Sequence, residues 1–476
     1  MNNQSYFWKF IERLGAQLVT FVTSIFLARI LNVSDYGIVS VVMIFILISD
    51  VLIYNGLPTT LVQKKNVTST DYKTAFTLNL LLGILLYFII IVIAFIIDKS
   101  SSVFELKFMM IVLGLKVVID SLGSVVQANV SRNFLFKKSF IASLTSSIVS
   151  GIVGIYLALN GVGAWALIFQ SLLNSSLNLI LLSILTKFML SFNYNKNSAL
   201  SLLAYGWKIS VSALIDSLFN QTRKILIATQ YSSTDLAFVN KGNQFPELFM
   251  SVISGTISSV AFPIMSRVQN DINEIKSIVR NSIRISTFII FPLLGGLVVI
   301  GDQLIILLLT EKWIQSYQYL IIASIAFMTW PIQIFAQNAI KSLGLSNIYL
   351  KIEITRKFFG VLILIIAFYI NLYAIVVSLI ISELISTIII LYYSNEIYSY
   401  RFKEQFFDIL PSVALTTMMM TSVYLLNFEI KNLYLSFITS ILIGAFTYVS
   451  LSILFKPKAY IELKKSIIIF IKEKKI

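Results

Sequence analysis

The sequence predicts an all-α integral membrane protein with about 14 transmembrane helices. The chain is 57% hydrophobic and only 12% charged, with a mean hydropathy of +0.87, which is not the composition of a water-soluble domain. Apolar runs of about 20 residues recur from one end to the other, and each is long enough to span a bilayer as a helix. The runs are continuous rather than alternating, which argues against the strands of a membrane barrel.

The predicted spans follow one another with short loops between them. The first apolar run is long, contains Arg13 and Arg29 and leads into the second, so we expect a spanning helix rather than a cleavable signal peptide. The basic tail, residues 458–476, has an apolar run of only about six residues and is predicted to lie on the inner leaflet or in solvent. The spans are predicted near residues 10–31, 38–57, 75–97, 107–129, 140–160, 162–185, 206–229, 240–265, 282–301, 314–337, 351–370, 372–394, 408–427 and 433–455.

The basic residues orient these spans. With the N-terminus in the cytoplasm, the cytoplasmic segments hold 27 of the 37 Lys and Arg residues, the outward segments hold six, and the spans hold four. This asymmetry follows the positive-inside rule, and one span too many or too few would scramble it. The pattern predicts cytoplasmic N- and C-termini. It also assigns the net charge of +15 to membrane orientation rather than to nucleic-acid binding.

The chain contains no Cys and no His. This composition excludes disulfides, thiol chemistry, His-ligated metals and a His proton switch. We therefore expect no cofactor and no metal centre. The ionisable residues within the spans are the remaining functional candidates, since a charge at the bilayer centre costs at least roughly 2.5–3.5 kcal/mol.

The stretch over residues 203–239 carries a polar stripe on an otherwise apolar helix. Asp216, Asn220, Arg223 and Lys224 are spaced so that they share one helix face. This face is predicted to line a substrate path. The alternative is a helix whose basic pair snorkels to one membrane face, although Asp216 lies too deep to do so easily.

Further charges are predicted in other spans. Lys116 and Asp120 are four residues apart and can pair on one helix face, within a site or as a structural pair. Glu383 is the single charge within its span, and with Asp216 it is a candidate for taking up H⁺ or Na⁺ and so coupling transport to an ion gradient. The alternative is a hydrogen bond to a neighbouring helix. Asp120 and Glu247 are the remaining candidates for ion coupling or charge pairing.

Cations prevail among these charges, and this favours an anionic substrate. Arg suits a phosphate because its planar fork donates two parallel hydrogen bonds. A headgroup with a pyrophosphate would fit such a site, whereas a lipid-soluble organic cation would not. Substrate contact is expected first from Arg223 and Lys224, and then from Lys116, Arg13 and Arg29.

An internal repeat is indicated by a shift of 200 residues. Six spans separate the two copies, so both run through the membrane in the same direction. This predicts two parallel six-helix bundles, over residues 1–200 and 201–397, with helices 13 and 14 added at 398–457. Parallel repeats place the substrate between the halves. The aligned pairs are Leu18 with Leu218, Ile25 with Ile225, Ala28 with Ala228, Asp35 with Asp235, and Val39 with Val239.

Residues 27–65 (LARILNVSDYGIVSVVMIFILISDVLIYNGLPTTLVQKK) carry a family resemblance. The pieces are the Leu-Ala-Arg before Leu31, the Asp35-Tyr36-Gly37 turn, and Gly56-Leu57 followed by Leu-Val-Gln at 61–63. Residues 339–351 (AIKSLGLSNIYLK) add a further piece, before the eleventh span. The chain resembles polysaccharide-export flippases of the Wzx type, in their WzxC-like branch. These belong to the MOP superfamily, which also holds lipid II flippases and multidrug and toxin extruders.

This resemblance implies a V-shaped central cavity between two lobes that opens alternately to each side. It implies translocation of undecaprenyl-diphosphate-linked oligosaccharides across the bacterial cytoplasmic (inner) membrane for a surface polysaccharide such as capsule or lipopolysaccharide O-antigen. The expected partners are the lipid-linked oligosaccharide, membrane lipids and polysaccharide polymerase machinery, and the expected state is a monomer. Span-1 arginines bind diphosphate in lipid II flippases, and Arg13 occupies a comparable part of span 1.

Two alternatives remain. A drug or toxin antiporter of the same superfamily would offer acidic and aromatic groups to a cationic substrate, and the cationic excess argues against it. A membrane polysaccharide polymerase, ligase or glycosyltransferase would share the apolar composition. Such enzymes normally need sizeable outer loops, whereas the outward loops here are predicted to have about ten residues or fewer, with no nucleophile–base constellation or nucleotide motif. We therefore expect a protein that is not an enzyme.

Overall fold

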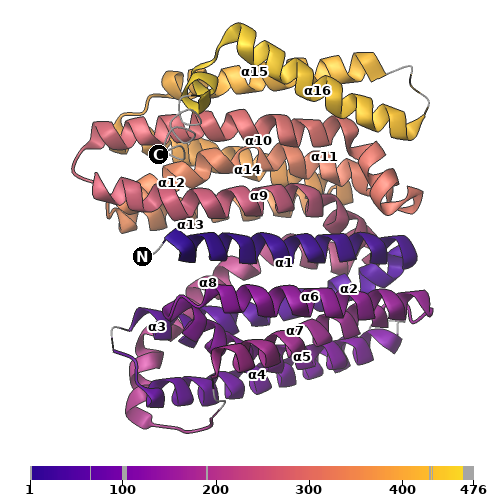
Figure 1. Cartoon of the computed structure of the whole chain (residues 1–476), viewed down its shortest axis with the longest axis vertical. Helices are drawn as coiled ribbons and strands as arrows, with labels where there is room; N and C mark the ends of the chain where they lie inside the picture. Colours follow the sequence, from indigo (N-terminus) through magenta and orange to yellow (C-terminus); the bar gives the residue numbers. More distant parts are fainter. Residues whose placement is uncertain are drawn as a thin grey trace. The chain divides into compact units, whose positions relative to one another are not determined.

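The computed structural model describes residues 3–64, 66–98, 104–188, 191–427, 430 and 432–464, and within these ranges every regular element is a helix (Figure 1). The helices of the first half are α1 (Asn3–Ile30), α2 (Val33–Asn55), α3 (Leu57–Gln63), α4 (Ser69–Asp98), α5 (Phe104–Arg132), α6 (Phe136–Leu159), α7 (Trp165–Thr186) and α8 (Lys196–Gln230). Those of the second half are α9 (Ser233–Arg267), α10 (Ile272–Leu309), the 3₁₀ helix η1 (Glu311–Trp313), α11 (Ser316–Phe327), α12 (Trp330–Ser342), α13 (Ser346–Phe368), α14 (Leu372–Tyr398), α15 (Phe402–Asn427) and α16 (Leu433–Phe455).

The helices bear out an all-α membrane protein. Every predicted span coincides with a helix or, at residues 314–337, with the pair α11 and α12. Within the described ranges, ten helices are long and apolar enough to cross a membrane, or eleven if the bent α8 is one span. Helix α13 does not meet this test because Lys351, Glu353, Arg356 and Lys357 crowd its first half. The predicted total of 14 spans therefore stays a prediction.

The outer surface of these helices is that of a membrane protein. On α4, for example, the side chains of Leu85, Phe88 and Ile96 are 56%, 61% and 63% exposed. Apolar surface on this scale is unfavourable in water and marks contact with lipid. The chain is therefore a multi-pass membrane protein.

The chain divides into two compact units, residues 1–237 and 238–476. Helix α8 belongs to the first unit, where it packs against α2, α3 and α4. The predicted lobes over 1–200 and 201–397, the separate helices at 398–457 and the central cavity between lobes stay predictions.

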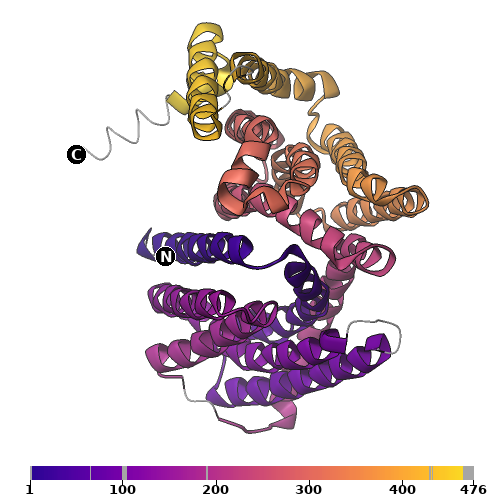
Figure 2. The same ribbon diagram turned by 90° about the vertical axis from the view of Figure 1, so that its right-hand side faces the viewer.

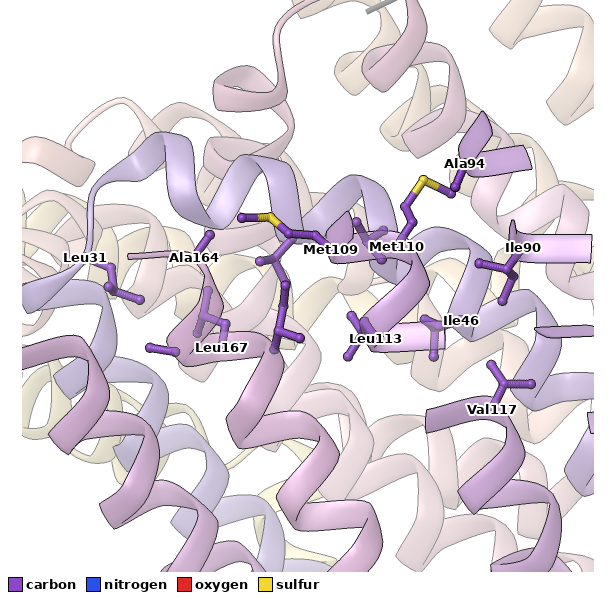
Figure 3. Close-up of a cluster of buried hydrophobic side chains, with 14 of the residues drawn as sticks. Leu31, Ile46, Ile90, Ala94, Met109, Met110, Leu113, Val117, Ala164 and Leu167 are labelled. Carbon is purple, nitrogen blue, oxygen red and sulfur yellow. The ribbon is translucent and has the colours of Figure 1, made fainter. Parts of the chain in front are cut away.

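In the first unit, α4 packs along α5 and α1 packs along α6, as both views show (Figures 1 and 2). Among its described residues, one apolar core joins α2, α4, α5 and α7, with Ile46, Ile90, Leu113 and Leu167 among its members (Figure 3). Because lipid is as apolar as these side chains, close packing rather than burial from water holds such helices together. The buried face of α6 is accordingly made largely of Ser, Ala and Gly.

The second unit is organised around α10, which packs against α11, α12, α15 and α16. With 38 residues at about 1.5 Å each, α10 is far longer than a hydrocarbon core of about 30 Å. Its charged first turns therefore project beyond the apolar span. The start of the predicted basic tail packs here too, with Ala459 buried against α10, α15 and α16. Residues 465–476 of that tail lie outside the described residues.

The two copies of the predicted repeat begin their second helices in the same way. At the start of α2, the backbone N–H of Asn32 donates to Oδ2 of Asp35 at 3.0 Å. At the start of α9, the N–H of Ser232 donates to Oδ2 of Asp235 at 3.1 Å. Both are reciprocal helix caps, and their residue numbers differ by 200, the shift of the predicted repeat. The shared cap supports the repeat independently of the apolar matches.

The Asp35-Tyr36-Gly37 turn has a structural role at each position. Asp35 caps α2, and the Tyr36 hydroxyl donates to the carbonyl oxygen of Ser24 on α1 at 3.2 Å. A Cβ added to Gly37 would lie 2.3 Å from the carbonyl oxygen of Ser233, so only glycine lets the starts of α2 and α9 approach this closely. The structure places these three residues within the first turns of α2 and not in a separate turn, and they hold the start of α2 against α1 and the start of α9.

The second motif, at residues 339–351, forms the turn between α12 and α13. Gly344 has a φ of +74°, and the N–H of Leu345 donates to the carbonyl oxygen of Ile340 at 3.3 Å. The N–H of Gly344 donates to the carbonyl oxygen of Lys341 at 3.1 Å. This pair of bonds is a Schellman motif, which favours glycine at the left-handed position.

Candidate functional site

A polar cavity of about 350 Å³ lies inside the first unit, between α2, α5, α6 and α7. Its lining is unusual for the interior of a membrane protein, because carboxylate, ammonium, amide and hydroxyl groups outnumber apolar side chains. The lining residues are Asp50, Tyr54, Lys116, Asp120, Gly123, Gln127, Ser143, Asn174, Ser175, Asn178, Leu179 and Leu182. Ionisable groups within a membrane protein that face a cavity are functional candidates.

Lys116 of α5 lies between two carboxylates at the wall of this cavity. Its Nζ donates to Oδ2 of Asp50 on α2 at 3.2 Å and to Oδ2 of Asp120, one turn further along α5. Lys116 and Asp120 thus pair as their spacing predicts. Asp50 is an additional partner that ties α2 to α5. The three groups carry a formal charge of −1, because two carboxylates share one ammonium.

Asn79 of α4 positions the helices that carry this cluster. Its side-chain amide donates to the carbonyl oxygens of Ile53 on α2, at 3.4 Å, and of Ser121 on α5, at 2.8 Å. These carbonyls adjoin Tyr54 and Asp120, which line the cavity. A buried amide that satisfies two helices at once fixes their register.

One wall of the cavity is held together by a ladder of hydrogen bonds between α6 and α7. The Asn174 amide donates to the hydroxyls of Ser147 and Ser150 at 3.4 and 3.2 Å. The Asn178 amide donates to the Ser143 hydroxyl at 3.2 Å. Since the amide nitrogens bind the wall, the amide carbonyl oxygens are left with bonding capacity toward the cavity.

The other predicted substrate-binding residues also belong to the first unit. Arg223 and Lys224 lie half-buried on α8, and Arg29 is exposed in the last turn of α1. Asp216 lies exposed on α8, two turns before Arg223. Arg13 is part of α1, but its side chain lies outside the described residues. The roles assigned to all of these residues stay predictions.

In the second unit, the carboxylate of Glu383 has a hydrogen-bond partner on a neighbouring helix. Gln333 on α12 donates from its amide to Oε2 of Glu383 on α14 at 2.8 Å, and its own Oε1 accepts from Arg356 on α13 at 2.6 Å. Arg356 also pairs with Glu353 at 2.7 Å. A chain of hydrogen bonds thus links α12, α13 and α14, as the alternative of a bond to a neighbouring helix anticipated. Glu247, the other predicted residue in this unit, is exposed on α9.

A second charge cluster ties the charged start of α10 to α15. Asp408 is buried and accepts from Nε of Arg280 at 2.7 Å, from Nε of Arg284 at 2.8 Å and from the hydroxyl of Tyr400 at 2.8 Å. Glu404, one turn earlier on α15, accepts from Arg280 at 2.8 Å. The two arginines of α10 are therefore balanced by two carboxylates of α15. We interpret this cluster as a structural clamp between the two helices.

The sequence did contain a signal for Asp50, a cavity residue that we had not predicted. Asp50 is the sole Asp, Glu, Lys or Arg between Asp35 and Lys64, in the middle of an apolar run. The polar residues of α6 and α7 gave a weaker signal, since Asn174 and Asn178 are four residues apart and share a helix face. Which helix each of them faces depends on packing between helices.

Comparison with known proteins places this arrangement in a family. The family model described as "Polysaccharide biosynthesis protein" matches residues 26–318. The chain belongs to this polysaccharide biosynthesis protein family. The matched region includes α2, α5, α6 and α7, and therefore the polar cavity.

Among curated relatives, the chain is 22% identical over 368 residues to an uncharacterized membrane protein in the cps region of Klebsiella pneumoniae, covering 75% of this chain and 74% of that protein. It is 20% identical to the succinoglycan biosynthesis transport protein ExoT of Rhizobium meliloti, covering 66% and 63%. It is 21% identical to the lipopolysaccharide biosynthesis protein WzxC of Escherichia coli, covering 60% and 59%. These matches confirm the resemblance to the WzxC-like branch.

Solved structures identify the fold of this family member. It resembles the lipid II flippase MurJ in an inward closed conformation, with a TM-score of 0.74, 15% identity, and coverage of 94% of this chain and 98% of that one. It also resembles an inward-facing multidrug resistance MATE transporter of the MOP superfamily, with a TM-score of 0.63, 13% identity, and coverage of 80% and 94%. The family member thus has the fold of MOP-superfamily transporters.

Proposed function

We propose that this family member is a flippase that moves undecaprenyl-diphosphate-linked oligosaccharides from the inner to the outer leaflet of the bacterial cytoplasmic membrane. One combination of findings carries the proposal. The family and its named relatives belong to polysaccharide biosynthesis, and the fold is shared with a lipid II flippase. A transporter fold in a polysaccharide biosynthesis family supports the proposal that the cargo is a glycan carried on a lipid. Alternating access of the two lobes would carry it across.

Arg223 and Lys224 are proposed as the first contacts of the diphosphate. They adjoin on α8, lie half-buried, and belong to a helix with the length of a bent membrane span. Two adjacent cations can neutralise a diphosphate, with the guanidinium contributing a bidentate contact. Arg13, Arg29 and Lys116 are secondary candidates; Lys116 already binds two carboxylates, which reduces its positive potential. Coupling to H⁺ or Na⁺ through Asp216, Asp120, Glu247 or Glu383 is part of the same proposal.

A double substitution tests these contacts. We expect Arg223→Ala with Lys224→Ala to abolish export while the protein still reaches the membrane in folded form. Lys137→Ala with Lys138→Ala is the matched control, because it removes two adjacent cations from the first turn of α6. Normal export by the Arg223/Lys224 variant would refute the assigned contacts.

The function itself is tested in cells that lack the gene. Lipid-linked oligosaccharides are extracted after treatment with a membrane-impermeant, sugar-modifying reagent that reports their leaflet. We expect complete units to accumulate on the inner leaflet. Units that reach the outer leaflet unpolymerised would indicate a polymerase instead, and an unchanged lipid pool would contradict both.

A second candidate function is an antiporter for organic cations. It is favoured by one observation, the formal charge of −1 on the Asp50–Lys116–Asp120 cluster beside Tyr54 in the polar cavity. A cation and an aromatic ring attract one another, so such a cavity suits a drug-like cation. Efflux of organic cations that depends on this gene would support it.

A further inference from the structure

The polar cavity of the first unit differs in charge from the site proposed for the diphosphate. Two carboxylates, Asp50 and Asp120, share the single ammonium of Lys116. Like charges repel, so this cavity disfavours a phosphate, and Lys116 is the least suitable of the cations proposed for the diphosphate. Its polar lining also disfavours a lipid tail. The occupant must therefore be polar, and neutral or cationic.

The cavity lining offers both hydrogen-bond acceptors and donors, which suits the hydroxyl groups of a ligand. Oδ1 of Asp50 is buried and has no hydrogen-bond partner within the described part of the chain. The carbonyl oxygens of Asn174 and Asn178 add acceptors, because their nitrogens bind the wall serines. Gln127 adds a donor, since its Oε1 accepts from Ser139 and its amide nitrogen remains. A sugar hydroxyl both donates and accepts, so it can pair with either kind of group.

A bare metal ion fits this cavity poorly, for two reasons, so coupling through Asp120 is left to H⁺ rather than to Na⁺. The ammonium of Lys116 already occupies the position between the two carboxylates, where a cation would bind. The cavity of about 350 Å³ is also far larger than the space of one ion. This is the volume of a small organic ligand, about one hexose with its bound water.

We infer that the polar cavity between α2, α5, α6 and α7 is a sugar-binding subsite for the oligosaccharide, selective for neutral or amino sugars over uronic acids. The inference rests on the proposed flippase function and deepens it. The diphosphate then binds at the cationic site on α8, and the sugars bind at a separate site, the acidic cavity. Asp50 and Asp120 accept from sugar hydroxyls or an amino group, and Tyr54 offers a ring for stacking.

Gly123 provides a direct way to fill the cavity. It lines the cavity from α5, and a Cβ built on it meets no heavy atom within 4 Å. Gly123→Phe therefore adds bulk to the cavity while leaving the Asp50–Lys116–Asp120 contacts in place. Gly296→Phe on α10 is the matched control, because Gly296 is also within a helix and its Cβ also meets nothing within 4 Å. Both changes raise helix propensity by the same amount.

Binding is measured with the full chain in lipid nanodiscs, using saturation-transfer NMR at millimolar concentrations. The probes are methyl glucoside, methyl glucosaminide and methyl glucuronide. We expect the first two to bind to the wild type and to Gly296→Phe, and to lose binding on Gly123→Phe. Glucuronide should bind about tenfold more weakly, which corresponds to roughly 1.4 kcal/mol.

Asp50→Asn is expected to strengthen binding of methyl glucuronide, a gain that misfolding cannot produce. It keeps the shape of the side chain and brings the formal charge of the cluster from −1 to zero. We expect glucuronide binding to rise about tenfold, toward that of glucoside. An unchanged preference would overturn the selectivity that we infer.

The remaining outcomes separate this inference from the flippase function. Absence of glycoside binding to the wild type overturns the subsite, as does binding that Gly123→Phe leaves unchanged. Binding of sodium or tetraphenylphosphonium in place of glycosides would assign the cavity to a cation. If Gly123→Phe supports normal leaflet transfer in cells while deletion of the gene blocks it, the flippase function stands and the subsite fails.

Discussion

Replacing Lys116 with Met tests how strongly the charge cluster holds α2 against α5. The substitution keeps a long, flexible side chain but removes the ammonium that Asp50 and Asp120 share. Removing one partner of a buried ion pair costs about 3–5 kcal/mol. The side chains of Lys116, Asp50 and Asp120 are 15%, 20% and 9% exposed, so water in the cavity solvates part of the remaining charge. We therefore expect the lower end, about 3 kcal/mol.

The assay is thermal unfolding of the purified full chain at fixed detergent and lipid, followed by loss of its monodisperse peak in size-exclusion chromatography. Lys107→Met is the matched control on the same helix, where Lys107 lies 4.2 Å from the centre of the Phe95 ring. Its loss should cost at most about 1 kcal/mol. The triple variant, Lys116→Met with Asp50→Asn and Asp120→Asn, should regain most of the stability because no charge is left without a partner.

Two results would refute this reasoning. Equal stability of Lys116→Met and Lys107→Met would mean that the cluster is too well hydrated to hold α2 against α5. Alternatively, the triple variant could be no more stable than the single one, which would place the loss in packing rather than in charge.

Three further predictions concern stability and use the same unfolding assay. Asp408→Ala should cost about 3–5 kcal/mol because it leaves two guanidinium groups of α10 without their buried partner. Glu404→Ala removes a side chain that is 29% exposed and should cost about 1 kcal/mol or less. Equal losses of stability in the two variants would contradict the structural clamp. Gly37→Ala should cost about 1–3 kcal/mol through its clash with the backbone of Ser233, and wild-type stability would contradict that close approach. Thr310→Gly should stabilise the folded protein by about 1 kcal/mol. Thr310 has φ +85° and ψ 168°, a backbone conformation that costs residues other than glycine about 1–3 kcal/mol. A lower unfolding temperature of the variant would contradict this prediction.

Transmembrane helices could be predicted in detail because the solvent imposes them. A bilayer leaves no water for exposed backbone groups, so an apolar run of sufficient length becomes a helix whatever its neighbours are. The basic residues predict the orientation of these helices by the same kind of local rule. The charged first half of α13 shows the limit, since Lys351, Glu353, Arg356 and Lys357 reduce its apolar character although the helix forms.

The candidate site could be predicted only where its contacts are local. The pair of Lys116 and Asp120 follows from a spacing of four residues on one helix. Asp50 joins this pair from another helix, at a sequence separation of 66 residues, and no periodicity reports such a contact. Glu383 illustrates the same limit, because its partner Gln333 lies 50 residues away.

The sequence by itself determined that this protein lies in a membrane, that it is helical and which family it resembles. It also predicts a repeat, and the helix caps at Asp35 and Asp235 agree with its shift of 200 residues. These features depend on composition, on helical period and on side chains near one another in the chain. Tertiary structure alone decided that α2, α5, α6 and α7 enclose a polar cavity with an acidic excess. The physical reason is that the register between packed helices fixes which charges meet, and that register arises from close packing over the whole length of each helix.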